Sequence, residues 1–165
     1  MISGSFANAF MIPFSATATL LALIATGLWI ALLGSKEKWR MPVAVLAGLV
    51  AGTLLPKLGL SLPFSGWVLP GSVVALGVLV ALDVVVVAWI ALAVTAAIFV
   101  YHGGAVAPRS GDLSSWLGFA VGTVTALAAG IGFDSMIVHA TSSRGVRVFG
   151  GVIALGGGWM LVGGL

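Results

Sequence analysis

The fold class is decided by residues 67–101, which read WVLPGSVVALGVLVALDVVVVAWIALAVTAAIFVY and contain one charged residue, Asp83. As a single α-helix this run would be about 52 Å long, whereas the hydrocarbon core of a bilayer is only about 30 Å thick. One helix of this length is too long for one membrane span. We therefore interpret the run as two spans, 67–82 and 84–101, joined by a tight turn in which Asp83 is a polar turn residue. The alternative is a bent helix with Asp83 buried, which would give five spans instead of six.

The composition of the whole chain predicts the same class of protein. Of the 165 residues, 61% are apolar and 7% are charged, against about 25% charged residues in soluble globular domains. So few charges could not cover the surface of a soluble fold. We expect a single all-α domain, residues 1–165, that forms a polytopic transmembrane bundle, and a soluble globular enzyme is excluded. With no cysteine, disulfides and thiolate metal sites are excluded as well.

About six apolar segments are long enough to span a membrane as helices, namely residues 11–33, 41–62, 67–82, 84–101, 114–133 and 146–165. The connections on one side carry five cations, Lys36, Lys38, Arg40, Arg144 and Arg147. The opposite side carries only Lys57 and Arg109. The excess of Lys and Arg predicts that the first group is cytoplasmic and that both termini lie on the outer side. Aromatic residues at predicted span ends are expected to anchor the bundle in the headgroup layer, and these are Trp39, Trp67, Tyr101 and Trp116.

We expect the chain to be an integral protein of the bacterial inner membrane. Its N-terminal segment has no basic residue ahead of the first apolar run, so no cleaved signal peptide is predicted. The basic residues are scattered over short connections and form no phosphate-binding stripe, so nucleic acid is not an expected partner. The expected partner is the lipid bilayer.

Glycine and alanine recur every four residues in several predicted spans, and the chain holds 24 glycines. On a helix this spacing makes a smooth face that another backbone can approach closely. The face could pack inside the chain's own bundle or against another integral membrane subunit or a second copy. The residues assigned to such faces are Gly48, Gly52, Gly118, Gly122, Gly130, Gly150 and Gly158.

Ionisable side chains at membrane depth are costly and often functional, and few occur here. His102 closes the fourth predicted span, where we expect it at the outer surface, bonded to loop backbone. It is the one candidate metal ligand. Asp134 and His139 fall in the fifth connection on the other side and, with Asp83, form the remaining candidate polar positions. A nickel or zinc site needs three or more converging ligands, so we predict no complete metal site and assign no cofactor.

Sequence signatures of catalysis are absent. The chain has no Gly-x-Ser-x-Gly elbow, no His-Glu-x-x-His helix and no Gly-x-x-x-x-Gly-Lys-Ser/Thr loop. We therefore expect that the protein is not an enzyme.

Several apolar strings carry a resemblance to a known family over most of the chain. They are Ala25-Thr-Gly-Leu-Trp29, Leu33-Gly34, Leu46-Ala-Gly48, Leu58-Gly-Leu-Ser-Leu-Pro63, Ser72-Val-Val-Ala-Leu-Gly-Val-Leu-Val-Ala-Leu82, His102-Gly-Gly-Ala105 and Ala129-Gly-Ile131. In these strings the chain resembles the HupE/UreJ family. The resemblance implies a small six-span membrane protein associated with nickel permeation for hydrogenase and urease maturation.

The chain departs from this family at the metal motif. The family pattern in the first span is His-Pro-x-x-Gly-x-Asp-His, and the corresponding stretch here is Ile12-Pro-Phe-Ser-Ala-Thr-Ala-Thr19. Pro13 is retained, while the two histidines and the aspartate are replaced by Ile12, Thr19 and Ala18. In the second motif His102 is retained, but the later histidine position holds Val106 or Ala107. The histidine of the fifth span corresponds to Leu127.

Three functions remain open from the sequence. The first is a non-catalytic, ligand-poor relative of the HupE/UreJ proteins that serves as an accessory or structural subunit of a membrane complex. The second is a permease for nickel, cobalt or another small solute, favoured by spans that Pro13, Pro70 and Gly71 interrupt, because broken helices often line solute sites. The third is a pigment- or quinone-binding subunit with His102 as a single axial ligand.

Overall fold

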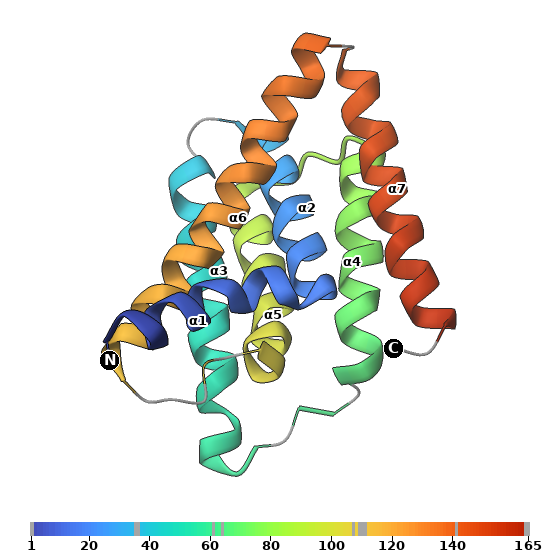
Figure 1. The fold of residues 1–165 in the computed structure, drawn as a ribbon. Helices are drawn as coiled ribbons and strands as arrows, with labels where there is room; N and C mark the ends of the chain where they lie inside the picture. The colour runs from blue at the N-terminus through green and yellow to red at the C-terminus, as the bar shows by residue number, and fades with distance from the viewer. Residues whose placement is uncertain are drawn as a thin grey trace.

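The computed structural model describes residues 2–34, 37–60, 62–63, 65–106, 108, 112–140 and 142–163, without the side chains of residues 2–4, 37, 38 and 57. Lys36, Ala107 and Arg109 lie outside the described residues. The elements are α1 (Ile2–Ser15), α2 (Thr17–Leu33), α3 (Glu37–Leu54), the 3₁₀ turn η1 (Pro56–Leu58), α4 (Ser65–Ala81), α5 (Ala88–Val106), α6 (Leu113–Ala140) and α7 (Ser143–Val162). Within these ranges the fold is all helical, as predicted (Figure 1).

Three of these helices are long and apolar enough to cross a membrane, namely α5, α6 and α7. The α1–α2 pair passes the same test if its two helices form one broken span. Residues Trp39–Leu54 of α3 and helix α4 are apolar but shorter. The chain is therefore a helical membrane protein.

The first predicted span, 11–33, consists of two helices that meet at a bend. Helix α1 already starts at Ile2, and it meets α2 at an angle of 77° across Ala16. Pro13 lies inside α1, where it lacks an N–H donor and its ring crowds the preceding turn, which weakens the helix. Ala16 is extended, and the Ser15 hydroxyl donates to the Ile12 carbonyl at 2.9 Å, which helps to satisfy the end of α1. By contrast, Pro70 lies within α4 without ending it.

The 67–101 run is two helices, and the alternative of one bent helix with a buried Asp83 is wrong. Asp83 is exposed and has a φ of 55°, a left-handed conformation that Asp tolerates in turns. The backbone then runs as a non-helical connection to Ala88. The buried indole of Trp29 in α2 donates from Nε1 to the Val84 carbonyl at 2.8 Å, so the central helix holds this connection in place.

The connection predicted at residues 134–147 is much shorter in the structure. Helix α6 continues to Ala140, and α7 begins at Ser143. Asp134 and His139 therefore lie on the last turns of α6 and not in a loop. Two residues that are five positions apart on a helix point their side chains to different faces.

Helix α2 is the centre of the bundle, with nine of its 17 residues buried. Around it the other helices form close pairs at the glycine rows. Gly118 and Gly122 of α6 lie against the backbone of Phe6 and Phe10 in α1, and Gly130 lies against Ile24 in α2.

The two remaining pairs use the same kind of contact. Helix α3 packs on α5 where Gly48 lies against Ala96 and Gly52 against Val100. Helix α4 packs on α7 where Gly77 lies against Gly150 and Ala154. Only residues without a Cβ allow backbones to approach so closely. The glycine rows thus contact neighbouring helices of the same chain.

Gly158 is the exception. A Cβ there would meet nothing within 4 Å, whereas Gly157 is buried against Val74 and Pro70. Seven residues return a helix almost to the same face, whereas eight turn it about 80° away. Within the chain, the row that begins at Gly150 therefore continues at Gly157, and the assignment of Gly158 to a packing or subunit face stays a prediction.

The helices from α2 to α7 run alternately in opposite directions. Figure 1 shows α2, α4 and α6 ending toward the top of the bundle, and α3 and α5 ending toward the bottom. At the upper end Arg147, near the start of α7, donates from Nε to the Ala81 carbonyl at the end of α4, at 3.0 Å. A cation at a helix C-terminus is favourable. At the lower end Asp112 caps α6 by accepting from the Ser115 N–H and hydroxyl.

Adjacent glycines of α7 give a direct test of this packing. A Cβ at Gly150 would lie 2.6 Å from the Ala81 nitrogen and 2.8 Å from the Gly77 oxygen, whereas one at Gly151 would meet nothing within 4 Å. We expect Gly150→Ala to lower the free energy of unfolding by about 1–3 kcal/mol, because backbone cannot yield without separating α4 from α7. The measurement is SDS-induced unfolding in mixed micelles, followed by tryptophan fluorescence.

Gly151→Ala is the matched control, and we expect it to leave the stability unchanged or slightly raised by the better helix propensity of Ala. Equal effects of the two substitutions would show that the α4–α7 contact is not close-packed.

Candidate functional site

His102 is the most distinctive polar residue of the bundle interior. It lies in α5, is 0% exposed, and has a hydroxyl at hydrogen-bonding distance from each ring nitrogen. Nδ1 is 2.9 Å from Thr19 Oγ1, and Nε2 is 2.9 Å from Ser72 Oγ. The prediction of a surface histidine bonded to loop backbone is therefore wrong. Helix α5 continues to Val106, which leaves His102 a full turn inside the helix and not at its end.

The direction of these hydrogen bonds follows from the Ser72 hydroxyl. It donates to the Leu69 carbonyl at 2.7 Å, and a hydroxyl has only one proton to donate. Its oxygen therefore accepts from the Nε2–H of His102. A neutral imidazole has a single N–H, so Nδ1 accepts from the hydroxyl of Thr19. Every polar atom of the ring is then satisfied with the imidazole uncharged.

The three side chains come from three helices, and the local sequence explains how they meet. Thr19 lies in the first turn of α2, which begins there only because the helix breaks at Ala16. Ser72 lies in α4, and the ring of Phe99, one turn before His102 in α5, has its centroid 5.4 Å from the imidazole centroid. Next to the histidine, Gly103 lies against the backbone of Leu49 in α3. We call this group of Thr19, Ser72 and His102 the polar triad.

A pocket adjoins the polar triad at the bend. It has a volume of about 340 Å³. Its lining comes from the break between α1 and α2 and from one residue each of α4, α5 and α7, and consists of Ala16, Thr17, Ala18, Thr19, Leu69, Val106 and Met160. The resemblance described above matches positions 18 and 19 to the Asp and the second His of the family pattern. Here they supply a methyl group and a hydroxyl.

The other candidate residues do not join this site. Asp83 is in its exposed turn. His139 is exposed on α6, and its Nδ1 lies 2.7 Å from the Ser135 carbonyl oxygen. Asp134 also belongs to the end of α6, toward α7. Among the residues that the structure describes, no three His, Cys, Asp or Glu side chains gather closely enough to hold a metal ion.

Thr19 and Ser72 were not identified as site residues from the sequence. They are 83 and 30 residues from His102, and no local pattern links them. The one feature of the sequence that points to such partners is chemical, because each polar side chain in a membrane span needs a partner within the bundle. That rule suggests that hydroxyls in otherwise apolar spans face the buried histidine, without saying which ones.

The fold defines a polytopic integral membrane protein. It is a helical bundle with apolar spans, helix pairs that pack closely at glycines, and a polar triad in its interior. Comparison with known proteins gives its family. The family model described as HupE / UreJ protein matches residues 1–160. Protein HupE of Rhizobium leguminosarum bv. viciae is 32% identical over 155 residues, which cover 92% of this chain and 81% of that protein.

The chain therefore belongs to the HupE/UreJ family, as its sequence strings predicted. Membership supports a role as a membrane accessory protein or in nickel transport. No solved structure matches the chain.

The hydrogen bonds of the polar triad can be tested by isosteric substitution. Thr19→Val leaves the Nδ1 lone pair of His102 buried without a donor, and Ser72→Ala leaves Nε2–H without an acceptor. We expect each to lower the free energy of unfolding in mixed micelles by about 0.5–2 kcal/mol, the range of interhelical hydrogen bonds in membranes.

Thr125→Val is the matched control, because the exposed Thr125 hydroxyl bonds only to the Val121 carbonyl of its own helix. We expect it to have a smaller effect than Thr19→Val. If Thr19→Val and Ser72→Ala are no more destabilising than Thr125→Val, the polar triad does not link the helices.

Proposed function

We propose that the protein is a non-catalytic accessory protein of the HupE/UreJ type, integral to the bacterial inner membrane, in which a contact between helices replaces the metal ligands of the family pattern. The observation that supports this most strongly is the engagement of both ring nitrogens of His102. Nε2 carries the ring's proton, and the lone pair of Nδ1 accepts from Thr19. A metal ion could bind the ring only after one of these bonds is broken.

The position of Thr19 strengthens the argument. In the family pattern this position holds a histidine. Here the hydroxyl of Thr19 donates to Nδ1 of His102, the nitrogen whose lone pair could otherwise bind a metal ion. The neighbouring ligand positions hold Ile12 and Ala18, which offer no lone pair at all. Hydroxyls are poor nickel ligands beside imidazole and carboxylate.

We propose six crossings for the membrane topology, with α1 and α2 forming a broken first crossing. From α2 to α7, successive helices run in opposite directions (Figure 1). Arg40 at the start of α3 and Arg147 at the start of α7 then belong to one end. The excess of Lys and Arg there supports the proposal that this end is cytoplasmic and that both termini lie outside.

The accessory role implies a membrane partner that contacts an outward surface, since the glycine rows pack inside the chain. Large apolar side chains are exposed over most helices, for example Val43, Leu155 and Trp159.

A small-solute permease is the second candidate, because the pocket of about 340 Å³ lies against the 77° break between α1 and α2. Broken helices place free backbone groups at such sites. The two candidate functions predict different properties of the purified protein. Stoichiometric foreign subunits in mild detergent support the accessory role, whereas solute uptake by proteoliposomes of the chain alone supports the permease.

Nickel binding by the purified chain tests the proposal. After incubation with Ni²⁺ and desalting in detergent, we expect substoichiometric nickel in the wild-type protein, measured by elemental mass spectrometry. Restoring the ligand residues of the family pattern with Ile12→His, Ala18→Asp and Thr19→His supplies three strong ligands on either side of the bend, one of them at the position that contacts His102. We expect this variant to bind about one nickel ion per chain.

Binding to exposed imidazole is controlled by His139→Ala in both backgrounds. One nickel ion per wild-type chain that is lost in His102→Ala and retained in His139→Ala would overturn the proposal and favour the permease.

A further inference from the structure

Thr26 is a second buried polar residue of the central helix α2, and it is 0% exposed. Its Oγ1 has no hydrogen-bond partner among the residues that the structure describes. An unpaired hydroxyl inside a bundle costs free energy, because nothing replaces the hydrogen bonds that the group would make in water. Buried polar side chains are nearly always satisfied by protein or by ordered water. The hydroxyl of Thr26 therefore points to a small polar ligand beside it.

Thr95 of α5 lies at the same level of the bundle as Thr26. Helices α2 and α5 run in opposite directions (Figure 1), and they meet where Thr19 is hydrogen-bonded to His102. Thr26 comes seven residues after Thr19, and Thr95 comes seven residues before His102. Seven residues return a helix almost to the same face after two turns. The two threonines therefore lie on the faces that α2 and α5 present to each other.

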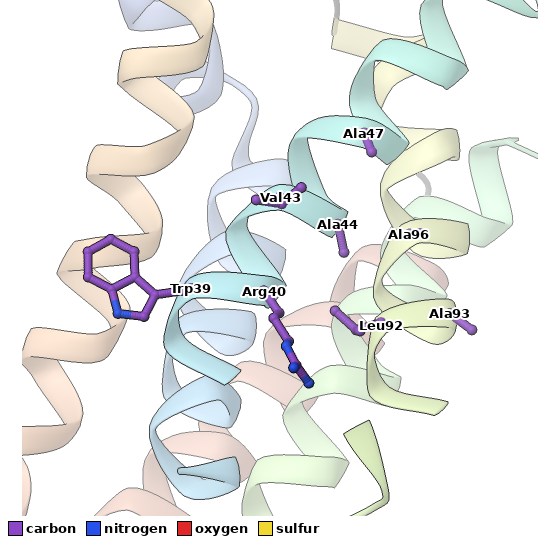
Figure 2. Close-up of a pocket in the computed structure, with 8 residues that line it drawn as sticks. All are labelled: Trp39, Arg40, Val43, Ala44, Ala47, Leu92, Ala93 and Ala96. Carbon is purple, nitrogen blue, oxygen red and sulfur yellow. The ribbon is translucent and has the colours of Figure 1, made fainter. Parts of the chain in front are cut away.

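The side chain of Thr95 belongs to the bundle interior. Figure 2 shows the outward side of α3 and α5, where a cavity of about 590 Å³ is lined from α5 by Leu92, Ala93 and Ala96. Thr95 does not line this cavity and is 0% exposed. Its hydroxyl donates to Met41 Sδ at 3.8 Å. Because the proton is directed to the sulfur, the Thr95 oxygen still has lone pairs that can accept a hydrogen bond.

The spacing between α2 and α5 leaves room for a ligand at this level. The glycines of these helices pack elsewhere, Gly27 on α6 and Gly103 on α3. At the polar triad a whole imidazole fills the distance between the two helices, whereas two turns away only two short threonine side chains face each other. Two hydroxyl oxygens that share a bridging water lie about 4.5 Å apart, since each hydrogen bond is about 2.8 Å long. A spacing set by an imidazole suits such a bridge.

We propose that one water molecule binds between Thr26 and Thr95 and links α2 to α5 in the bundle interior. The Thr26 hydroxyl donates to the water oxygen, and the water donates to the Thr95 oxygen. A buried water needs at least two polar partners, and these two hydroxyls supply them. The water site lies outside the polar triad and serves an accessory protein and a permease alike.

Thr123 of α6 provides a matched control. Its hydroxyl is also fully buried and without a partner among the described residues. However, Thr123 lies between Gly122 and Gly130, where α6 is in backbone contact with α1 and α2. Backbones that approach so closely leave less room for a water between the helices.

Isosteric substitution tests the water site through the stability of the full chain in mixed micelles. We expect Thr26→Val and Thr95→Val each to raise the unfolding equilibrium constant about threefold, as for one interhelical hydrogen bond in a membrane. Thr123→Val removes a buried hydroxyl that has no partner, so it should leave this constant unchanged or lower it. If Thr26→Val is no more destabilising than Thr123→Val, the water site is overturned.

A crystal structure of the wild-type protein that shows ordered water separates a bridging water from a direct contact. We expect one water within about 3 Å of the hydroxyl oxygens of both Thr26 and Thr95. A direct hydrogen bond between the two threonines, or one from Thr26 to a carbonyl of its own helix, would satisfy the hydroxyl without water and would contradict the proposal.

Discussion

The hydrogen-bonded imidazole of His102 is the constraint on which the interior of this bundle depends. A buried histidine in a membrane protein must satisfy two ring nitrogens without water. Here one hydroxyl from α2 and one from α4 do so at 2.9 Å each. The ring therefore fixes the mutual positions of three helices, and the break at Ala16 is what brings Thr19 to it. The same two bonds occupy both ring nitrogens, including the lone pair of Nδ1.

Close backbone contact between helices is the second constraint. In lipid, apolar side chains gain little by leaving the solvent, so packing and hydrogen bonds must hold the helices together. The glycines of α3, α6 and α7 let the backbones of paired helices come into close contact. Because these faces are internal, the apolar outward surface is left for the lipid bilayer.

The sequence predicted the membrane class, the family and the turn at Asp83, because hydropathy and turn chemistry are local properties. It failed where the outcome depends on contacts between distant residues. His102 was predicted to close the fourth span, yet α5 continues to Val106, and Gly103 lies against α3. The angle of the break after Pro13 and the extension of α6 past Asp134 also depend on packing, which hydropathy does not describe. The partners of His102 could not be assigned, because several hydroxyls in the spans were equally eligible.

The most direct measurement of the central claim is the ¹⁵N spectrum of the His102 side chain in lipid bilayers, recorded with and without Ni²⁺ and assigned with His139→Ala. The polar triad predicts a neutral imidazole with its proton on Nε2 and an unprotonated Nδ1, and the two resonances should not move when nickel is added. An Nδ1–H tautomer, or a His102 resonance that shifts or broadens with stoichiometric nickel, would contradict the assignment of His102 as a contact between helices.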